Sequence, residues 1–188
     1  MSIIHRATLV PSKLEAISAW LPTQTWFAGH GSTDLEAVGA YRFDDPAGDV
    51  GIETHLVRTA SGTVFQVPLT YRSAPLGGAD AYLVATMEHS VLGTRWVYDG
   101  VGDPVYVTVT TAAIVDGAEQ AELVVHSPDG ARTVRESTTR VRGTGGHPST
   151  SPRLYVRRVI EASATELPHL FGTWPGQEDP IPLVELRT

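Results

Sequence analysis

The glycine-rich segment GTGGHPSTSP, residues 143–152, is the first stretch whose composition could bind a reactive group. Loops that hold phosphate offer consecutive backbone N–H groups and usually a lysine. This segment lacks the G-x-x-x-x-G-K-[ST] spacing, and Pro148 and Pro152 each remove a backbone donor. The single lysine, Lys13, is far away in the sequence. We therefore expect a connection between strands and no nucleotide site. Weak anion binding is expected only from the arginines that follow, Arg153, Arg157 and Arg158.

Histidines and carboxylates form no recognisable catalytic or metal-binding pattern. No two of the seven histidines are spaced i, i+2 or i+4, the spacings that favour a shared metal ion. Glu88 and His89 are adjacent, but neighbouring residues of a strand point to opposite faces. Asp44 and Asp45 lie in a turn-forming cluster, and no G-x-S-x-G motif is present. We predict no catalytic residue, no metal and no cofactor, with a small hydrolase as an open alternative.

Aromatic residues are the third candidate, because their flat apolar faces can stack on sugar rings. Trp26 and Phe27 stand next to each other, just before Gly29. They are either such a platform or a plug that packs a helix against a sheet. Trp174 lies in HLFGTWPG, where the flanking proline and glycines favour an exposed ring. The predicted ligand-binding side chains are accordingly those of His169, Phe171 and Trp174.

Composition limits the class of protein. The 188 residues suffice for one domain or for two small subdomains with a shared core. There is no cysteine, and the formal net charge of −7 argues against binding to nucleic acid. No segment approaches the roughly 20 apolar residues that span a bilayer, so we expect a cytoplasmic protein without membrane contact.

The first expected element is a helix over residues 12–20. Ser12 and Glu15 form an S-x-x-E capping box, and Pro22 ends the helix. The expected inward-facing residues are Leu14, Ile17 and Leu21. Apolar, β-branched segments then predict strands over 35–43, 50–59, 63–72, 81–90 and 94–100, the second and third forming a hairpin. Pro68 places the strand 63–72 at an edge or at a bulge.

The second half of the chain is less regular in pattern. Residues 104–115 alternate like a strand, but Asp103 followed by Pro104 favours a helix start, and we expect a helix. Residues 121–143 predict a hairpin with a turn at 127–130, and 153–161 the last strand. The tail beyond it, rich in proline and glycine, is expected to be irregular. The predicted class is α+β, a twisted antiparallel sheet with two helices.

Three ordered segments resemble actinobacterial maltokinases. WLPTQTWFAGHG is similar to the LP-x-Q-x-W-F/Y-A-G pattern near the start of that family, FQVPLTYR to a YQVPL strand, and HSVLGTRWVYDGVGDP to an AVLG…WVYDG…DP segment. The resembling positions include Trp26, Phe27, Gly29, Trp96, Tyr98 and Asp99. The similarity covers roughly the first 115 residues, 116–160 weakly and the tail hardly at all.

The resemblance implies the N-terminal cap of maltokinase, a cystatin-like element with a small antiparallel β-meander. It implies that Trp26 and Phe27 plug the core, that Gly29 permits a tight passage, and that 104–115 is helical. The division implied is a cap-like region 1–115 and a region 116–188 packed against it. The kinase lobes and their H-G-D-x-H catalytic loop are absent from these 188 residues.

The expected function is a non-catalytic, regulatory or adaptor module of α-glucan, trehalose or maltose metabolism, including glycogen. Its expected partner is a sugar kinase or another enzyme of that metabolism, and a homo-oligomer is left open. The alternative from another class is a carbohydrate-binding module that uses exposed aromatic residues.

Overall fold

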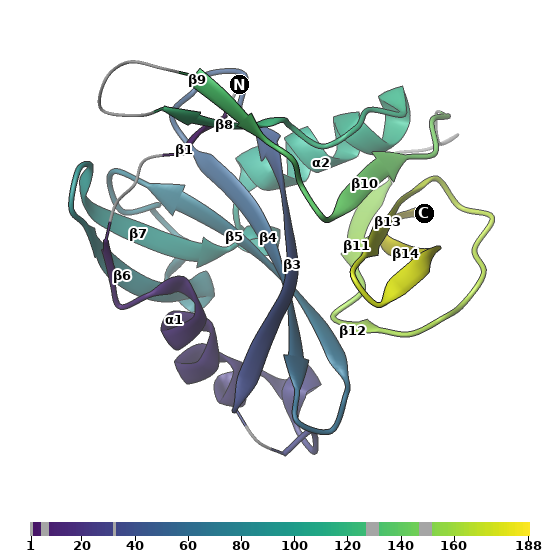
Figure 1. Ribbon diagram of the computed structural model, residues 1–188, viewed down its shortest axis with the longest axis horizontal. Coiled ribbons are helices and arrows are strands. Elements are labelled where there is room, and N and C mark those ends of the chain that lie inside the picture. The colour runs from purple at the N-terminus through teal and green to yellow at the C-terminus, as the bar shows by residue number, and fades with distance from the viewer. Residues whose placement is uncertain (1, 5–7, 32, 127–131, 147–151) are drawn as a thin grey trace.

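The computed structural model describes residues 2–4, 8–31, 33–126, 132–146 and 152–188, with the backbone only for 2–4, 124–126 and 132–135. Two α-helices accompany three sheets in which all pairs except one are antiparallel within this part of the chain (Figure 1). The predicted α+β class is confirmed. None of the described helices has the length and apolar character that crossing a membrane requires.

A long, twisted sheet forms the centre of the molecule. Its strand order is β2-β6-β7-β5-β4-β3, and β12 adds to β5. The strands are β2 (Leu9–Val10), β3 (Leu35–Asp44), β4 (Gly51–Thr59), β5 (Val64–Arg72), β6 (Leu83–His89), β7 (Gly93–Asp99) and β12 (Val159–Ile160). All five strands predicted between residues 35 and 100 are present, and β4 and β5 form the predicted hairpin.

Helix α1 (Lys13–Trp20) packs on one face of this sheet. The Ser12 hydroxyl accepts from the Glu15 N–H at 3.3 Å and the Glu15 carboxylate accepts from the Ser12 N–H at 2.7 Å, which confirms the capping box. Ile17 and Leu21 are fully buried, whereas Leu14 is partly buried. Two 3-10 turns, η1 (Leu21–Thr23) and η2 (Thr25–Phe27), continue from the helix.

Pro68 does not lie in an edge strand, so that prediction is wrong. The Gln66 N–H points away from β4 and donates to the Arg158 carbonyl, and the nitrogen of Pro68, two residues later, points to the same side. On that side β12 pairs only as far as Phe65 and β7 begins at Leu69. The nitrogen of Pro68 therefore lies between the end of the β12 pairing and the start of the β7 pairing. Neither strand would accept a hydrogen bond from it, so the proline interrupts no β-ladder.

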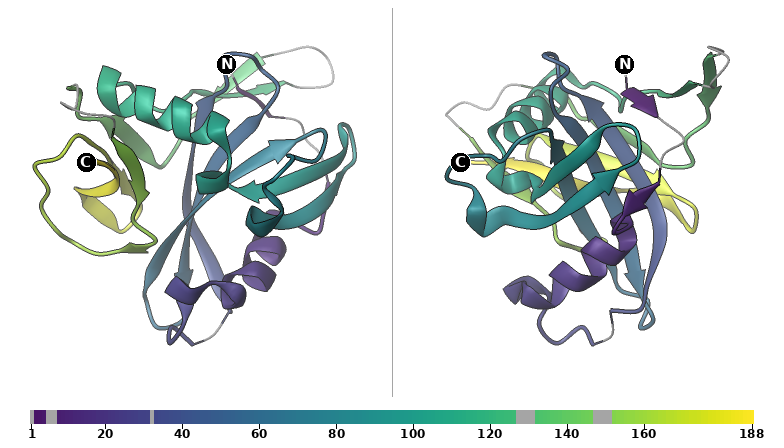
Figure 2. Two further views of the ribbon diagram at one scale, coloured as in Figure 1. Left: turned by 180° about the vertical axis from the view of Figure 1, so that it is seen from behind. Right: turned by 90° about the vertical axis from the view of Figure 1, so that its left-hand side faces the viewer.

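Helix α2 (Pro104–Asp116) lies on the opposite face of the central sheet from α1 (Figure 2). The Asp103 carboxylate accepts from the Val105 N–H at 2.9 Å, Pro104 occupies the first turn, and Gly117 ends the helix. The alternating valines of this segment favour a strand, but the segment is helical, and the Asp103 cap stabilises its first turn. The other 3-10 turns are η3 (Asp80–Tyr82) and η4 (Gly100–Gly102).

The C-terminal tail is not irregular, and this expectation is wrong. It forms the hairpin β13 (His169–Trp174) and β14 (Gln177–Arg187), at the centre of a sheet of order β10-β13-β14-β11. The flanking strands are β10 (Arg140–Gly143) and β11 (Arg153–Val156). The segment 153–161 is likewise not one strand, because β11 and β12 belong to different sheets.

The third sheet has the order β1-β8-β9 and contains β1 (Ser2–Ile4), β8 (Leu123–His126) and β9 (Arg132–Arg135). The pairing of β8 with β9 confirms the hairpin predicted within 121–143. Its turn at 127–130 lies outside the described residues, as do residues 147–151 of the glycine-rich segment.

Two apolar cores lie on the two faces of the central sheet. Leu56 belongs to the core shared with α2 and the β10-β13-β14-β11 sheet, and its neighbour Val57 belongs to the core under α1. The Gln66 side chain joins the sheets directly, since its Nε2 donates to the carbonyls of Arg157 at 3.2 Å and Leu183 at 2.9 Å.

The division of the chain into a region 1–115 and a region 116–188 stays a prediction.

Candidate functional site

The strongest candidate site is a pocket of about 370 Å³ between the end of α1 and the edge strand β11. We call it the aromatic pocket and define it by Trp20, Trp26, Tyr82, Asp99, Tyr155 and Arg158. These residues come from α1, η2, η3, β7, β11 and the segment before β12. The pocket therefore exists only where segments far apart in the chain meet.

Four aromatic rings form its walls. The Trp20 and Trp26 rings meet edge to face with centroids 5.8 Å apart. Tyr82 rests on Gly102, where an added Cβ would lie only 2.1 Å from Tyr82 Cγ. The Tyr155 ring carries the Arg187 guanidinium 3.2 Å above its centroid. Each tyrosine is thus supported by a neighbour and is still about two-fifths exposed, 41% for Tyr82 and 43% for Tyr155.

A buried ion pair forms the polar part of the pocket. The Arg158 Nη2 atom donates to Asp99 Oδ2, and the guanidinium also lies 4.9 Å above the Trp26 ring centroid. Burial raises the pKa of Asp99, and the positive charge of Arg158 offsets only part of that rise. Asp99 Oδ1 and Arg158 Nη1 are buried and have no hydrogen-bond partner. The pocket therefore borders one unused acceptor and one unused donor.

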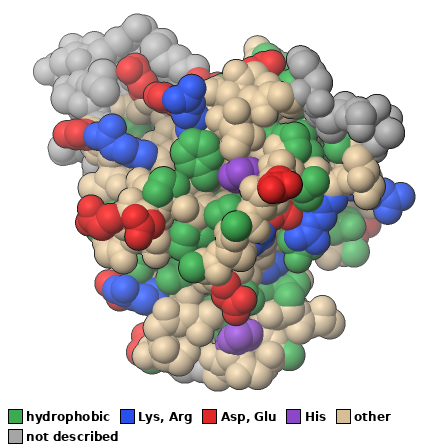
Figure 3. All heavy atoms as spheres, turned by 90° about the vertical axis from the view of Figure 1, so that its right-hand side faces the viewer, with side chains coloured by type: hydrophobic (Ala, Val, Ile, Leu, Met, Phe, Trp, Pro, Cys, Tyr) green, Lys and Arg blue, Asp and Glu red, His purple; other side chains and the backbone are tan. Residues whose placement is uncertain are grey.

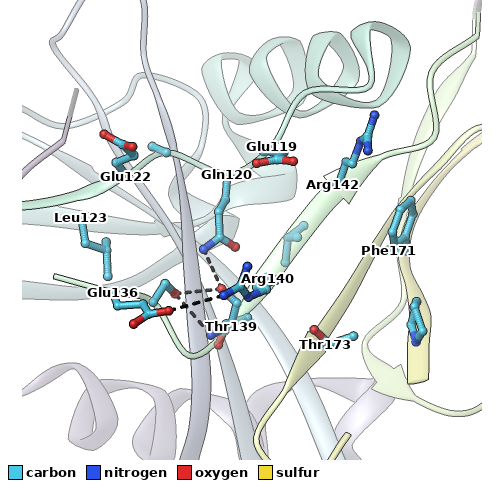
Figure 4. Close-up of a pocket in the computed structure, with 14 residues that line it drawn as sticks. Glu119, Gln120, Glu122, Leu123, Glu136, Thr139, Arg140, Arg142, Phe171 and Thr173 are labelled. Atoms are coloured by element: carbon cyan, nitrogen blue, oxygen red, sulfur yellow. Dashed lines mark hydrogen bonds and ion pairs between the residues drawn. The ribbon is translucent and has the colours of Figure 1, made fainter. Parts of the chain in front are cut away.

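A second hollow, of about 440 Å³, lies beside β10 (Figure 4). Gln120 Nε2 donates to the Thr139 carbonyl at 2.6 Å across it, and Arg140 Nη2 lies 3.4 Å from Glu136 Oε1. Arg140 and Glu136 have side chains 78% and 88% exposed, so this ion pair is solvated and worth little. Acidic, basic and apolar side chains are also mixed on the face with the C-terminal sheet (Figure 3). Neither the hollow beside β10 nor this face carries an excess of one charge that would favour a charged ligand.

The predicted ligand-binding residues do not come together. His169 and Phe171 lie on one face of β13, with ring centroids 6.0 Å apart, and Trp174 lies on the other face. Trp174 is 6% exposed and belongs to the core, so the expectation of an exposed ring is wrong. Phe171 borders the hollow beside β10. A role of His169 and Phe171 in binding stays a prediction.

The residues of the family-like pattern lie partly in the core and partly at the aromatic pocket. Phe27 is buried and packs on Phe65 at 5.0 Å between centroids, as a plug should, but Trp26 is only half-buried and reaches the aromatic pocket. Gly29 has a φ of 88°, which favours glycine, but an added Cβ would meet no atom within 4 Å, so the glycine serves the turn of the backbone and not a tight passage. The Tyr98 hydroxyl accepts from the Leu76 N–H at 2.9 Å, and Trp96 is half-buried in β7.

The sequence did not reveal Tyr82, Tyr155 or the role of Arg158. Tyr82 ends the 3-10 turn η3 and Tyr155 lies within β11, and no local sequence pattern indicates that either ring is exposed. Arg157 and Arg158 were expected at most to attract an anion, but they pair with Glu185 and Asp99 respectively. Among the described residues no group of three or more histidine, aspartate or glutamate side chains could hold a metal ion.

A second buried charge cluster lies under the start of α1. Glu53 Oε2 accepts from Lys13 Nζ and lies 3.4 Å from His55 Nε2, which in turn lies 3.2 Å from the Tyr71 hydroxyl. Burial alone would raise the pKa of Glu53, but His55, Lys13 and Arg42 hold it well below its ordinary value. The cluster borders neither hollow and anchors α1 to the sheet.

Part of the sequence matches a known protein family. The family model of the maltokinase N-terminal cap domain matches residues 20–103. No curated protein matches the chain. The matched range contributes Trp20, Trp26, Tyr82 and Asp99 to the aromatic pocket, and the remainder of the chain contributes Tyr155 and Arg158. The resemblance found in the sequence is thereby confirmed for residues 20–103, which match the maltokinase N-terminal cap domain.

Proposed function

We propose that this protein is a non-catalytic accessory module of maltokinase-related carbohydrate metabolism. It regulates or links a cytoplasmic partner enzyme such as a sugar kinase. The family match supports the metabolic context, because the matched domain is the cap of maltokinase. The regulatory or adaptor role is our inference from that match.

One observation carries the non-catalytic assignment: the amides at the start of the glycine-rich segment are already used. The N–H groups of Gly143, Thr144, Gly145 and Gly146 donate to carbonyls of the protein, those of Ala118, His169, Ile114 and Val115. A phosphate cradle needs such groups free and convergent. These four amides instead fix β10 and the end of α2.

The buried carboxylates support the same assignment. Each is held by a cation, in the pairs Asp99–Arg158, Asp103–Arg72, Glu53–Lys13 and Glu185–Arg157. Magnesium-dependent phosphoryl transfer needs carboxylates that are free to hold the metal. In the described part of the chain each of these four already has a cation as its partner.

The test has two arms. Calorimetric titration of the full chain with ATP and magnesium, and phosphate-transfer assays on maltose, trehalose and glucosamine, should show neither binding nor turnover. Added to a purified maltokinase, the chain should bind and change the rate of maltose phosphorylation. Nucleotide binding in the low micromolar range, or turnover by the chain alone, would make it a kinase. Failure to bind the maltokinase would refute the adaptor role for that partner.

A further inference from the structure

The aromatic pocket has rigid walls that remain open to solvent. Tyr82 is supported by Gly102 and Tyr155 by Arg187. A ligand that binds between the two rings therefore does not have to immobilise them. Both rings are still about two-fifths exposed, whereas most aromatic side chains in the described part of the chain are more deeply covered. A ligand that packs on such supported, exposed rings gains apolar contact while the side chains of the protein lose little conformational entropy.

The charge of the pocket excludes charged ligands. Asp99 and Arg158 are the charged residues among its lining, and they neutralise each other. An incoming anion would meet Asp99, and an incoming cation would meet the Arg158 guanidinium, which already occupies the position over Trp26. The pocket therefore favours an uncharged ligand.

The unused polar atoms define the functional group of that ligand. Asp99 Oδ1 can only accept a hydrogen bond while Asp99 is ionised, and Arg158 Nη1 can only donate one. A hydroxyl group both donates and accepts, so it can satisfy either atom, and a ligand with several hydroxyls can satisfy both. A small rotation of the side chains must uncover these atoms, because solvent does not reach them in the free protein.

We propose that the aromatic pocket binds an uncharged pyranose sugar. Such a sugar combines apolar C–H faces, which pack on Tyr82 and Tyr155, with hydroxyls for Asp99 and Arg158. The volume of about 370 Å³ lies at the lower end of the 300–1,000 Å³ typical of small-molecule sites, so the occupant is one or two rings long. This site is distinct from the predicted group His169, Phe171 and Trp174, and it does not depend on the adaptor role.

The experiment titrates the full chain with glucose, maltose and trehalose, read by tryptophan fluorescence and by calorimetry. Saturable binding of at least one sugar is expected, and sodium phosphate and choline, as charged controls, should not compete. Y82A and Y155A should each weaken binding about tenfold. Y82F and Y155F, which keep the rings, should retain it. Both tyrosines are exposed, so their alanine variants should fold normally.

F171A tests the competing site beside β10, since Phe171 is a partly exposed aromatic residue that borders that hollow and lies outside the aromatic pocket. It should bind the sugar as the unmodified chain does. Absence of saturable binding by all three sugars would overturn the proposal. So would binding that F171A abolishes and Y82A and Y155A leave unchanged, because the site would then lie beside β10. Sugar binding without any effect on maltokinase would refute only the adaptor role.

Discussion

Arg158 reaches back 59 residues along the chain to form an ion pair with Asp99, and its guanidinium packs on the ring of Trp26 at the same time. One side chain from outside the family-matched range thus holds two residues inside it. The contact is both a part of the pocket wall and a link between segments that are distant in sequence.

Loss of this ion pair should destabilise the protein strongly. Arg158→Met keeps most of the side-chain length but leaves Asp99, with a side chain only 5% exposed, without its cation. Breaking one partner of a buried pair costs about 3–5 kcal/mol, and we expect a loss of that size in urea unfolding. The matched control is Arg58→Met, since Arg58 pairs with Glu36 at the surface and should cost less than about 1 kcal/mol. Equal losses in the two variants would contradict the prediction.

Phe27 should contribute more to stability than Trp26, although tryptophan is the larger residue. Phe27 is 4% exposed and packs on Phe65, so Phe27→Ala should cost about 3–5 kcal/mol. Trp26 is half-buried, and Trp26→Ala should cost less. The free energy of unfolding of both variants, measured by urea titration, decides the order. A larger loss for Trp26→Ala would show that Trp26 is the principal plug.

Acid should destabilise the protein in part through Glu53. The pKa of Glu53 lies well below its ordinary value in the folded protein, and an unfolded chain has a glutamate pKa of about 4.3. The unfolded state therefore binds the proton first, so the stabilisation is present above about pH 4.3 and is lost as the pH falls below it. In Glu53→Gln the free energy of unfolding should be lower at pH 7 and fall less steeply below pH 5.

Glu36→Gln is the control for that experiment, because Glu36 lies at the surface with a side chain 67% exposed. Its stability should follow the pH as the unmodified chain does. Asp103 and Glu185, whose pKa values are also lowered, should leave some acid sensitivity in Glu53→Gln. An unchanged slope in Glu53→Gln would mean that the buried cluster makes no contribution to acid sensitivity.

Asp103 should be the residue on which α2 depends most. Its carboxylate caps the helix at Val105 and accepts from Arg72 Nε and Nη2, both at 2.7 Å. Asp103→Ala removes a cap worth about 1 kcal/mol and leaves a guanidinium partner unsatisfied at about 1–3 kcal/mol, so we expect a loss of about 2–4 kcal/mol in thermal or urea unfolding. Asp116→Ala, at the exposed far end of the same helix, should be neutral or slightly stabilising. A similar loss in both would argue against the cap.

Local signals predicted the elements that local contacts decide. Ser12 with Glu15 and Asp103 with Pro104 marked the two helix starts correctly, because a cap bonds residues two or three positions away. The hairpin β13–β14 was missed although WPGQ, with Pro175 second and Gly176 third at a φ of 85°, is a turn-forming sequence. Pro180 and Pro182 made the following strand resemble a loop.

The site could not be predicted in the same way, because its parts meet only through tertiary contacts. Nothing near Arg158 in the sequence indicates Asp99 as its partner. The burial of Trp174 follows from the alternation of β13, which places Leu170, Gly172 and Trp174 on the core side. That alternation could be applied only once the segment was recognised as a strand.

The position of β14 has a consequence for synthesis. Three residues of β14 are almost completely buried in the core shared with α2: Leu183, Val184 and Leu186. They come last in the sequence among the residues of this core. A ribosome delivers residues in sequence order, so the cap-like part leaves it with one face of its central sheet only partly covered, by α2. That face can be closed only after residue 186 has emerged, and until then the nascent chain exposes apolar surface of the kind that chaperones bind.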